Sequence, residues 1–152
     1  MSHEPEPPSL VFHHFGVACR DLDRESRSYA LLGYHPEADD FEDDVQGVRG
    51  RFLVGGGPRM ELLVSLPGRD VLEPWLAVGS RIYHQAFTTS DLDAAHRALC
   101  AAGGRTVVAP VPATAFQGRR ICFVMLRTMS LVELIDSAAE GPRPETAWPV
   151  SA

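Results

Sequence analysis

Two histidines and two glutamates lie inside apolar stretches of this sequence, where an unpaired charge is energetically unfavourable. His14 lies in LVFHHFGVA and His84 in IYHQAF, while Glu61 lies in MELLV and Glu133 in VELID. Imidazole and carboxylate groups are ordinary ligands of divalent transition metals. The four residues, called the quartet below, are therefore candidate ligands of one divalent ion, and Co, Ni, Mn, Fe and Zn all suit this donor set.

An internal repeat relates the quartet in two pairs. The stretch FHHFGVACRDLDRESRSYALLG matches IYHQAFTTSDLDAAHRALCAAGG, so that His14 falls on His84. Further along, MELLV matches VELID after a small insertion, and Glu61 falls on Glu133. A single histidine or glutamate in a strand is more often a core or surface residue, but four at matching positions of a repeat favour a metal site.

His13 stands beside His14 and falls on Tyr83 in the repeat. Neighbouring residues of a strand point to opposite faces of a sheet. We therefore predict that His14 is the ligand, and that His13 faces the other side of the sheet as a packing or surface residue.

The elements that position the quartet follow the same repeat. In each copy an apolar strand leads into an aspartate that can cap a helix, Asp21 or Asp91, and a glycine ends the helix. Two strands around a short turn follow in RGRFLVGGGPRMELLVS and in RRICFVMLRTMSLVELIDS. The pattern predicts an α+β fold in which each half contains a strand, a helix and about three strands. The predicted domain covers 10–137, with half-repeats 10–66 and 80–137 and flexible tails at 1–9 and 138–152.

Composition narrows the expected partners and location. The chain has 152 residues and a net charge of −6, which argues against nucleic acid as the main partner. It contains no apolar run of the ~18 residues that a membrane span needs. The first residues lack a signal-peptide pattern, so a cytoplasmic location is expected. An exposed sheet edge, which such halves would leave, predicts a homodimer.

The residues around the quartet resemble those of the vicinal oxygen chelate superfamily, which includes glyoxalase I, methylmalonyl-CoA epimerase, extradiol dioxygenases and bleomycin-resistance proteins. The resemblance covers roughly residues 10–137 and rests on HFGVA with the following Asp-Leu, on Gln-Gly-Val at 46–48, on HQAF and on VEL. It implies two paired βαβββ modules whose curved sheets form a metal-centred cup. It also implies that His14, Glu61, His84 and Glu133 hold the metal.

Three positions depart from the pattern of the epimerases in that superfamily. Glu61 stands where epimerases commonly have glutamine, and is closer to bacterial glyoxalase I. Gly50 stands where epimerases have a glutamate that serves as a catalytic base. The stretch RTMS at 127–130 replaces the usual Asp-Pro-x-Gly turn before the last strand.

The quartet and the resemblance together predict a metal-dependent isomerase or epimerase, or a lyase, acting on a small molecule. Such an enzyme transfers a proton next to a carbonyl through a metal-stabilised enolate, and Glu133 or Glu61 would be the general base. The predicted pocket contains inward-facing apolar side chains and an arginine for an anionic group, namely Phe12, Leu63, Ala86, Leu131 and Arg120.

Two alternatives use the same fold. A small-molecule sequestering protein, of the antibiotic-resistance kind, would need the cup without the metal set; the intact quartet counts against it and Gly50 counts for it. An iron-dependent ring-cleaving dioxygenase would need two histidines and one carboxylate. Glu61, as a fourth candidate ligand, counts against the dioxygenase.

Overall fold

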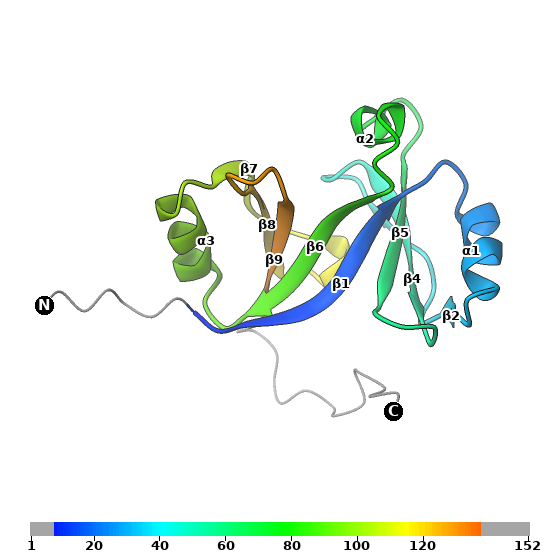
Figure 1. The fold of residues 1–152 in the computed structure, drawn as a ribbon, viewed down its shortest axis with the longest axis horizontal. Coiled ribbons are helices and arrows are strands. Elements are labelled where there is room, and N and C mark those ends of the chain that lie inside the picture. The colour runs from blue at the N-terminus through cyan, green and yellow to red at the C-terminus, as the bar shows by residue number, and fades with distance from the viewer. Residues whose placement is uncertain (1–7, 138–152) are drawn as a thin grey trace, which may run out of the picture.

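The computed structural model describes residues 8–137, so the tail at 138–152 and most of the predicted tail at 1–9 lie outside the described residues. The strands form one mixed sheet of nine strands in the order β2-β4-β5-β1-β6-β9-β8-β7, and β3 pairs with β4. Helices α1 and α3 lie on the outer side of the curved sheet (Figure 1). The predicted α+β fold class is confirmed. No helix within residues 8–137 is long and apolar enough to cross a membrane.

Each half of the chain forms one module of the sheet. The first module consists of β1 (Leu10–Ala18), α1 (Leu22–Ala30), β2 (His35–Pro36), β3 (Phe41–Asp43), β4 (Val48–Val54) and β5 (Met60–Ser65). The short helix α2 (Glu73–Ala77) lies between the modules. The second module consists of β6 (Ile82–Thr89), α3 (Leu92–Ala101), β7 (Arg105–Pro112), the 3₁₀ helix η1 (Thr114–Phe116), β8 (Arg120–Met125) and β9 (Leu131–Asp136). Where the second module has the single strand β7, the first has two short strands, β2 and β3.

The two modules repeat the same strand pairings. β1 pairs with β5 in parallel, and β6 pairs with β9 in parallel. β1 and β6 pair antiparallel with each other and join the modules at the centre of the sheet (Figure 1). Each strand that carries a quartet histidine therefore lies between a strand with a quartet glutamate and the other histidine strand.

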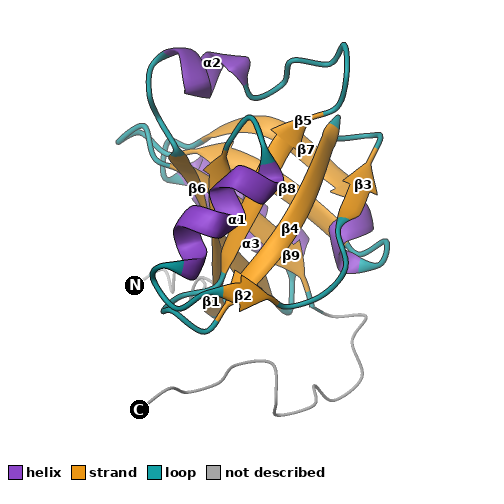
Figure 2. Ribbon diagram, turned by 90° about the vertical axis from the view of Figure 1, so that its right-hand side faces the viewer, coloured by secondary structure: helices purple, strands orange, loops and turns teal. Residues whose placement is uncertain are grey.

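Each long helix covers the outer face of its own module. The side chain of Asp21 accepts a hydrogen bond from the Arg24 amide at the start of α1, and Asp91 accepts one from the Ala94 amide at the start of α3. These are the two predicted caps. The apolar residues buried under the helices include Val17, Leu22 and Leu62 in the first module and Leu92, Val124 and Leu134 in the second. The outer face is thus covered by helix packing, and Figure 2 shows α1 against the strands of its module.

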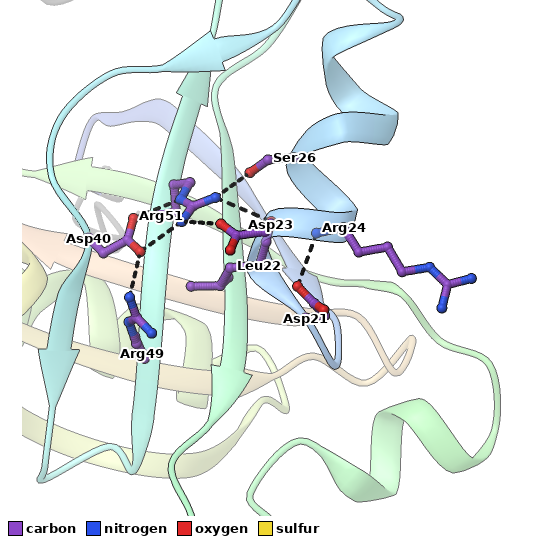
Figure 3. A network of polar contacts seen from close by, with 8 residues as sticks. All are labelled: Asp21, Leu22, Asp23, Arg24, Ser26, Asp40, Arg49 and Arg51. Carbon is purple, nitrogen blue, oxygen red and sulfur yellow. Dashed lines mark hydrogen bonds and ion pairs between the residues drawn. The ribbon is translucent and has the colours of Figure 1, made fainter.

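Arg51 of β4 links helix α1 to the segment before β3 (Figure 3). Its guanidinium donates hydrogen bonds to Asp40 at 2.7 and 2.9 Å, and further ones to Asp23, the Ser26 hydroxyl and the Leu22 carbonyl. The hydrogen bonds from Arg51 hold the pKa of Asp40 below its usual value. The pair therefore stabilises the fold fully above the unfolded pKa of an aspartate, about 3.9, and the contribution is lost as the pH falls through the lowered pKa.

Replacing Arg51 with methionine should lower the free energy of unfolding by about 2 to 4 kcal/mol, because Asp40 and the Leu22 carbonyl lose their donors. Arg49→Met is a matched control. Arg49 makes one hydrogen bond of 3.0 Å to Asp40 and its side chain is 49% exposed, so the expected loss is below about 1 kcal/mol. Urea denaturation followed by circular dichroism measures both losses. Equal losses would contradict the role assigned to Arg51.

Candidate metal centre

The strand register places the quartet in two rows of neighbouring residues across the sheet. One row, on β5, β1 and β6, consists of Glu61, Gly16 and His84. The other row, on β1, β6 and β9, consists of His14, Ala86 and Glu133. In each row a histidine and a glutamate flank a residue whose side chain is small or absent. The two longer side chains of each row can therefore converge over the middle strand.

Gly16 makes room for the ring of His84. A Cβ atom at Gly16 would lie 1.9 Å from His84 Cε1 and 2.2 Å from His84 Nδ1. Any side chain at this position would displace the imidazole from its present place. The glycine of HFGVA is thus part of the site, although it offers no ligand atom.

A β-bulge precedes each quartet histidine. The register between β1 and β6 shifts twice, which leaves His13 of β1 and Tyr83 of β6 without an opposite residue. Because a bulge redirects the extra side chain, His13 turns toward the inner face. Its ring centroid lies 5.6 Å from that of Phe116 and 5.0 Å from that of His14. The prediction that His13 faces the other side of the sheet is wrong.

The four side chains of the quartet meet in one buried cluster. His14 Nε2 lies 3.3 Å from a carboxylate oxygen of Glu61, 3.3 Å from one of Glu133 and 3.2 Å from His84 Nε2. His84 Nε2 lies 3.6 and 3.5 Å from the same two oxygens. One ligand atom from each residue lies within 4.8 Å of the others, and all four residues are buried. The repeat thus brought together the four residues that it paired in the sequence.

The donor set and its spacing suit a divalent ion. Two neighbouring ligands at about 2.1 Å from an ion are about 3.0 Å apart in octahedral geometry and about 3.4 Å apart in tetrahedral geometry. The separations in the quartet are close to these values. Among the described side chains, Glu133 Oε1 and His84 Nδ1 are buried without a hydrogen-bond partner. A cation would give Glu133 the partner that a buried carboxylate oxygen needs, so the cluster is compatible with a divalent metal site.

Charges inside the quartet complement one another. Burial alone would lower the pKa of His14, but the charge of Glu61 and the close approach of both carboxylates to its Nε2 raise this pKa to about 9. Burial would raise the pKa of Glu133, but His14 and His84 outweigh burial and hold that pKa well below its usual value. The Glu133 carboxyl is therefore ionised at neutral pH, as a metal ligand or a proton acceptor must be.

Comparison with known proteins agrees with this geometry. The family model described as the Glyoxalase/Bleomycin resistance protein/Dioxygenase superfamily matches residues 13–123. The chain belongs to this superfamily. The crystal structure of methylmalonyl-CoA epimerase from Mycobacterium tuberculosis is similar to it, with a TM-score of 0.71, 27% sequence identity and coverage of 96% of each chain. The vicinal oxygen chelate resemblance predicted from the sequence is thus confirmed.

Two further solved structures are similar to this superfamily member. A variant of Streptomyces coelicolor methylmalonyl-CoA epimerase, in complex with 2-nitronate-propionyl-CoA, has a TM-score of 0.68 and 30% identity over 86% of this chain and 100% of that one. A hypothetical protein from Bacillus halodurans has a TM-score of 0.74 at 19% identity over 89% of this chain and 99% of that one, a likeness that shows the fold alone. No curated protein matches the chain.

A series of polar side chains leads away from the quartet. His13 Nδ1 and His14 Nδ1 share a hydrogen bond of 2.8 Å. Arg59 donates to His13 Nε2 at 3.1 Å and binds the carboxylate oxygens of Glu37 at 2.6 and 3.2 Å. The Arg59 side chain is buried, and it fixes His13 from the far side. Because a guanidinium can only donate, His13 Nε2 accepts, and a neutral His13 donates from Nδ1 to His14 Nδ1. His13 thus holds the ring of His14 with Nε2 toward the two glutamates, and this Nε2 has to lose its proton to bind an ion.

A cavity of about 460 Å³ opens beside the quartet. Glu61 and Glu133 line it, together with aromatic residues that include Trp75, Tyr83 and Phe116. Burial and the charges of the two glutamates raise the pKa of Tyr83 well above its ordinary value, so its phenol keeps its proton. The cavity therefore offers two carboxylates beside walls that are largely apolar.

The predicted pocket residues are only partly in the cavity lining. Leu63 and Leu131 line the cavity, while Phe12, Ala86 and Arg120 do not. Ala86 is completely buried at the middle of its row and does not reach the space. The structure thus places these last three outside the cavity lining.

Phe12 and Arg120 are directed elsewhere by contacts that the sequence does not reveal. The bulge at His13 sends Phe12 to the other face, where its ring lies 5.0 Å from Phe15 and 5.8 Å from Phe87. Arg120 forms ion pairs with Asp93 of α3 at 2.9 Å and with Asp136 at 3.6 Å.

The ring of Phe41 lies beside Gly50, the position at which epimerases have a glutamate that serves as a catalytic base. Gly50 of β4 pairs with Phe41 of β3, and a Cβ at Gly50 would lie 2.2 Å from Phe41 Cζ. A side chain at Gly50 is therefore incompatible with the present position of Phe41, which also lines the cavity. Glu61 and Glu133 are carboxylates that line the same cavity, beside the two histidines.

Proposed function

We propose that the protein is a metal-dependent isomerase or epimerase, or a lyase of related mechanism, that moves a proton next to a carbonyl group. The proposal rests on one observation above all. Two histidines and two glutamates form a single buried cluster whose carboxylates line a cavity of about 460 Å³. The epimerases similar to this chain at 27% and 30% identity support the same reaction class, since one of them is bound to 2-nitronate-propionyl-CoA.

In this proposal His14, Glu61, His84 and Glu133 hold one divalent ion of the Co, Ni, Mn, Fe or Zn group. Such an ion, when bound, supplies a Lewis acid that stabilises negative charge developing on a carbonyl oxygen. The two histidines supply imidazole nitrogens, His14 after it loses the proton that its raised pKa keeps on the ring at neutral pH, and the two glutamates balance the charge of the ion. The apolar walls of the cavity keep water from the reacting carbon.

Glu133 is the proposed general base. Its carboxylate lines the cavity and is ionised at neutral pH. Its Oε1 atom lies 3.3 and 3.5 Å from the Nε2 atoms of His14 and His84, and is buried. A proton taken by Glu133 from the carbon next to the carbonyl can return to that carbon, which gives epimerisation, or to a neighbouring atom, which gives isomerisation. Glu61 is the second candidate for this role.

Exchange of the substrate α-hydrogen with deuterated water tests the proposal. Acyl thioesters and α-hydroxycarbonyl compounds are incubated with the metal-loaded protein and followed by proton NMR. Exchange that stops when a chelator removes the metal would support the enzyme. No exchange with any compound, together with tight binding of an unrelated aromatic molecule, would overturn it in favour of a sequestering protein. The Phe41 ring beside Gly50 is the observation that favours this second function.

The His13→Ala variant should bind a divalent ion about 10- to 100-fold more weakly, because residues that orient a ligating histidine have effects of this size. His96→Ala is the matched control, since His96 lies on α3 and hydrogen-bonds Thr106. Isothermal titration with Zn²⁺ measures the affinity, and thermal unfolding in chelator reports any loss of folding separately. An unchanged affinity in His13→Ala would contradict the orienting role.

The homodimer, the cytoplasmic location and the domain limits 10–137 stay predictions. The described sheet is open, with β2 and β7 at its ends. These edges are the feature from which association was predicted.

A further inference from the structure

We infer that the substrate of this cavity is a neutral carbonyl compound with an apolar, ring-sized group, and that a second negative charge on the substrate is disfavoured. The inference rests on the proposed function, because it places the reacting carbonyl at the quartet. It concerns the remaining part of the substrate, which has to occupy the rest of the cavity. Three observations on the cavity lining support it.

The charged groups that line the cavity within residues 8–137 have no net positive charge to offer an anionic group. These groups belong to Asp43, Glu61, Glu133 and Arg69. A divalent ion would balance the two glutamates, and the positive charge of Arg69 equals the negative charge of Asp43, so that the sum over these groups is zero. Arg69 Nη1 also donates to the Asp44 carbonyl at 2.7 Å. A substrate carboxylate in this space would lose its hydration and would make the net charge of the lining negative, which is unfavourable.

Asp43 is fixed and cannot turn away from such a substrate. It is 2% exposed, and its two carboxylate oxygens accept hydrogen bonds from the amides of Gln46 and Thr114 at 2.9 and 3.2 Å. These bonds hold the loop after β3 against η1. A negative charge therefore stays in the lining regardless of the ligand.

Aromatic rings and exposed valines provide the surface that an apolar group would cover. Phe41, Trp75 and Phe116 line the cavity from three separate segments. Val45 and Val107 line it as well, although they are 65% and 50% exposed. Apolar side chains gathered at an opening are typical of a binding site for an apolar ligand. The volume of about 460 Å³ lies in the range of small-molecule sites.

Two thioesters that differ at one substituent test the inference. The N-acetylcysteamine thioesters of 2-phenylpropionic acid and of methylmalonic acid both have an α-hydrogen and a methyl group, and differ in a phenyl ring against a carboxylate. The methyl ester of the second compound is a neutral form of the same skeleton. Binding to the metal-loaded protein is measured by calorimetry, and α-hydrogen exchange by NMR. We expect the phenyl compound to bind at least tenfold more tightly than the methylmalonyl compound, with the methyl ester between them.

Val107→Lys adds a positive charge at the opening of the cavity without altering the core. It should shift the preference at least threefold toward the methylmalonyl compound. Val78→Lys is the control, because Val78 is exposed and lies outside the lining, and it should leave the preference unchanged. Equal or tighter binding of the methylmalonyl compound, or equal effects of the two lysine variants, would overturn the inference.

The two hypotheses fail in different ways. Tight binding of the phenyl compound without exchange of any α-hydrogen would overturn the proposed reaction and support the ligand class. Faster exchange of the methylmalonyl compound, at equal concentration, would support the reaction and overturn the ligand class.

Discussion

The His84→Ala variant should bind a divalent ion about two to three orders of magnitude more weakly than the unaltered protein. Four-ligand zinc sites have binding free energies of about 10 to 16 kcal/mol, so one ligand in four accounts for roughly 3 kcal/mol, or about 10² to 10³ in affinity. His84 is 2% exposed, and its Nε2 lies 3.2 Å from His14 Nε2. Its loss would leave two glutamates facing one histidine.

The measurement is a titration with Zn²⁺, followed by heat or by the rise of the unfolding temperature on metal addition. A ligand that binds only the folded state stabilises it in proportion to the logarithm of its concentration over Kd. The unaltered protein should show this rise, and His84→Ala should show almost none. His96→Ala removes an imidazole outside the quartet and should behave as the unaltered protein. Unchanged metal affinity in His84→Ala would show that the quartet is not a metal site.

The quartet was predictable because it depends on a regularity of the sequence. The two halves have the same order of elements and the same pairings, β1 with β5 and β6 with β9. Equivalent positions of the repeat therefore became equivalent positions of the sheet, and His14 met His84 and both glutamates. The helix caps at Asp21 and Asp91 were predictable for a simpler reason, since the hydrogen bond of a cap is local to one turn.

The regular alternation of side chains along a strand could not predict which side of the sheet Phe12 and His13 face. A bulge arises in the pairing of β1 with β6, whose residues are far apart in the sequence. It placed His13 inside and Phe12 outside, opposite to the prediction for each. The sequence contained one usable sign of the bulge, which is that His13 aligns with Tyr83 in the repeat. Both residues are bulged, and both lie beside a quartet histidine.

Most residues of the cavity lining, apart from Leu63 and Leu131, were not predicted, and the reason is different. Trp75 lies on the short helix α2 between the modules, and Phe116 ends the 3₁₀ helix η1. Elements this short show no hydrophobic period from which a facing side could be inferred. The same holds for Arg120, whose position depends on an ion pair with Asp93 of α3. Such contacts are decided by packing between distant segments.

The Glu133→Gln variant should lose about 10² to 10⁴ in turnover while it keeps most of its metal affinity. Glutamine preserves the size of the side chain and one oxygen donor, but it cannot accept a proton at neutral pH. Loss of a positioned general base has effects of this size. The variant is assayed for α-hydrogen exchange on a compound that the unaltered protein turns over, with metal content measured on the same sample.

Glu61→Gln is the matched control, since Glu61 holds the equivalent position in the other row. The two glutamates lie at nearly equal distances from the two histidines, so the comparison of these two variants decides which of them is the base. Glu61 also matches a position where epimerases commonly have glutamine, so this change should cost less than about tenfold in turnover. Equal losses in the two variants would show that the glutamates act together and would contradict Glu133 as the sole base. A larger loss in Glu61→Gln would transfer the role of base to Glu61.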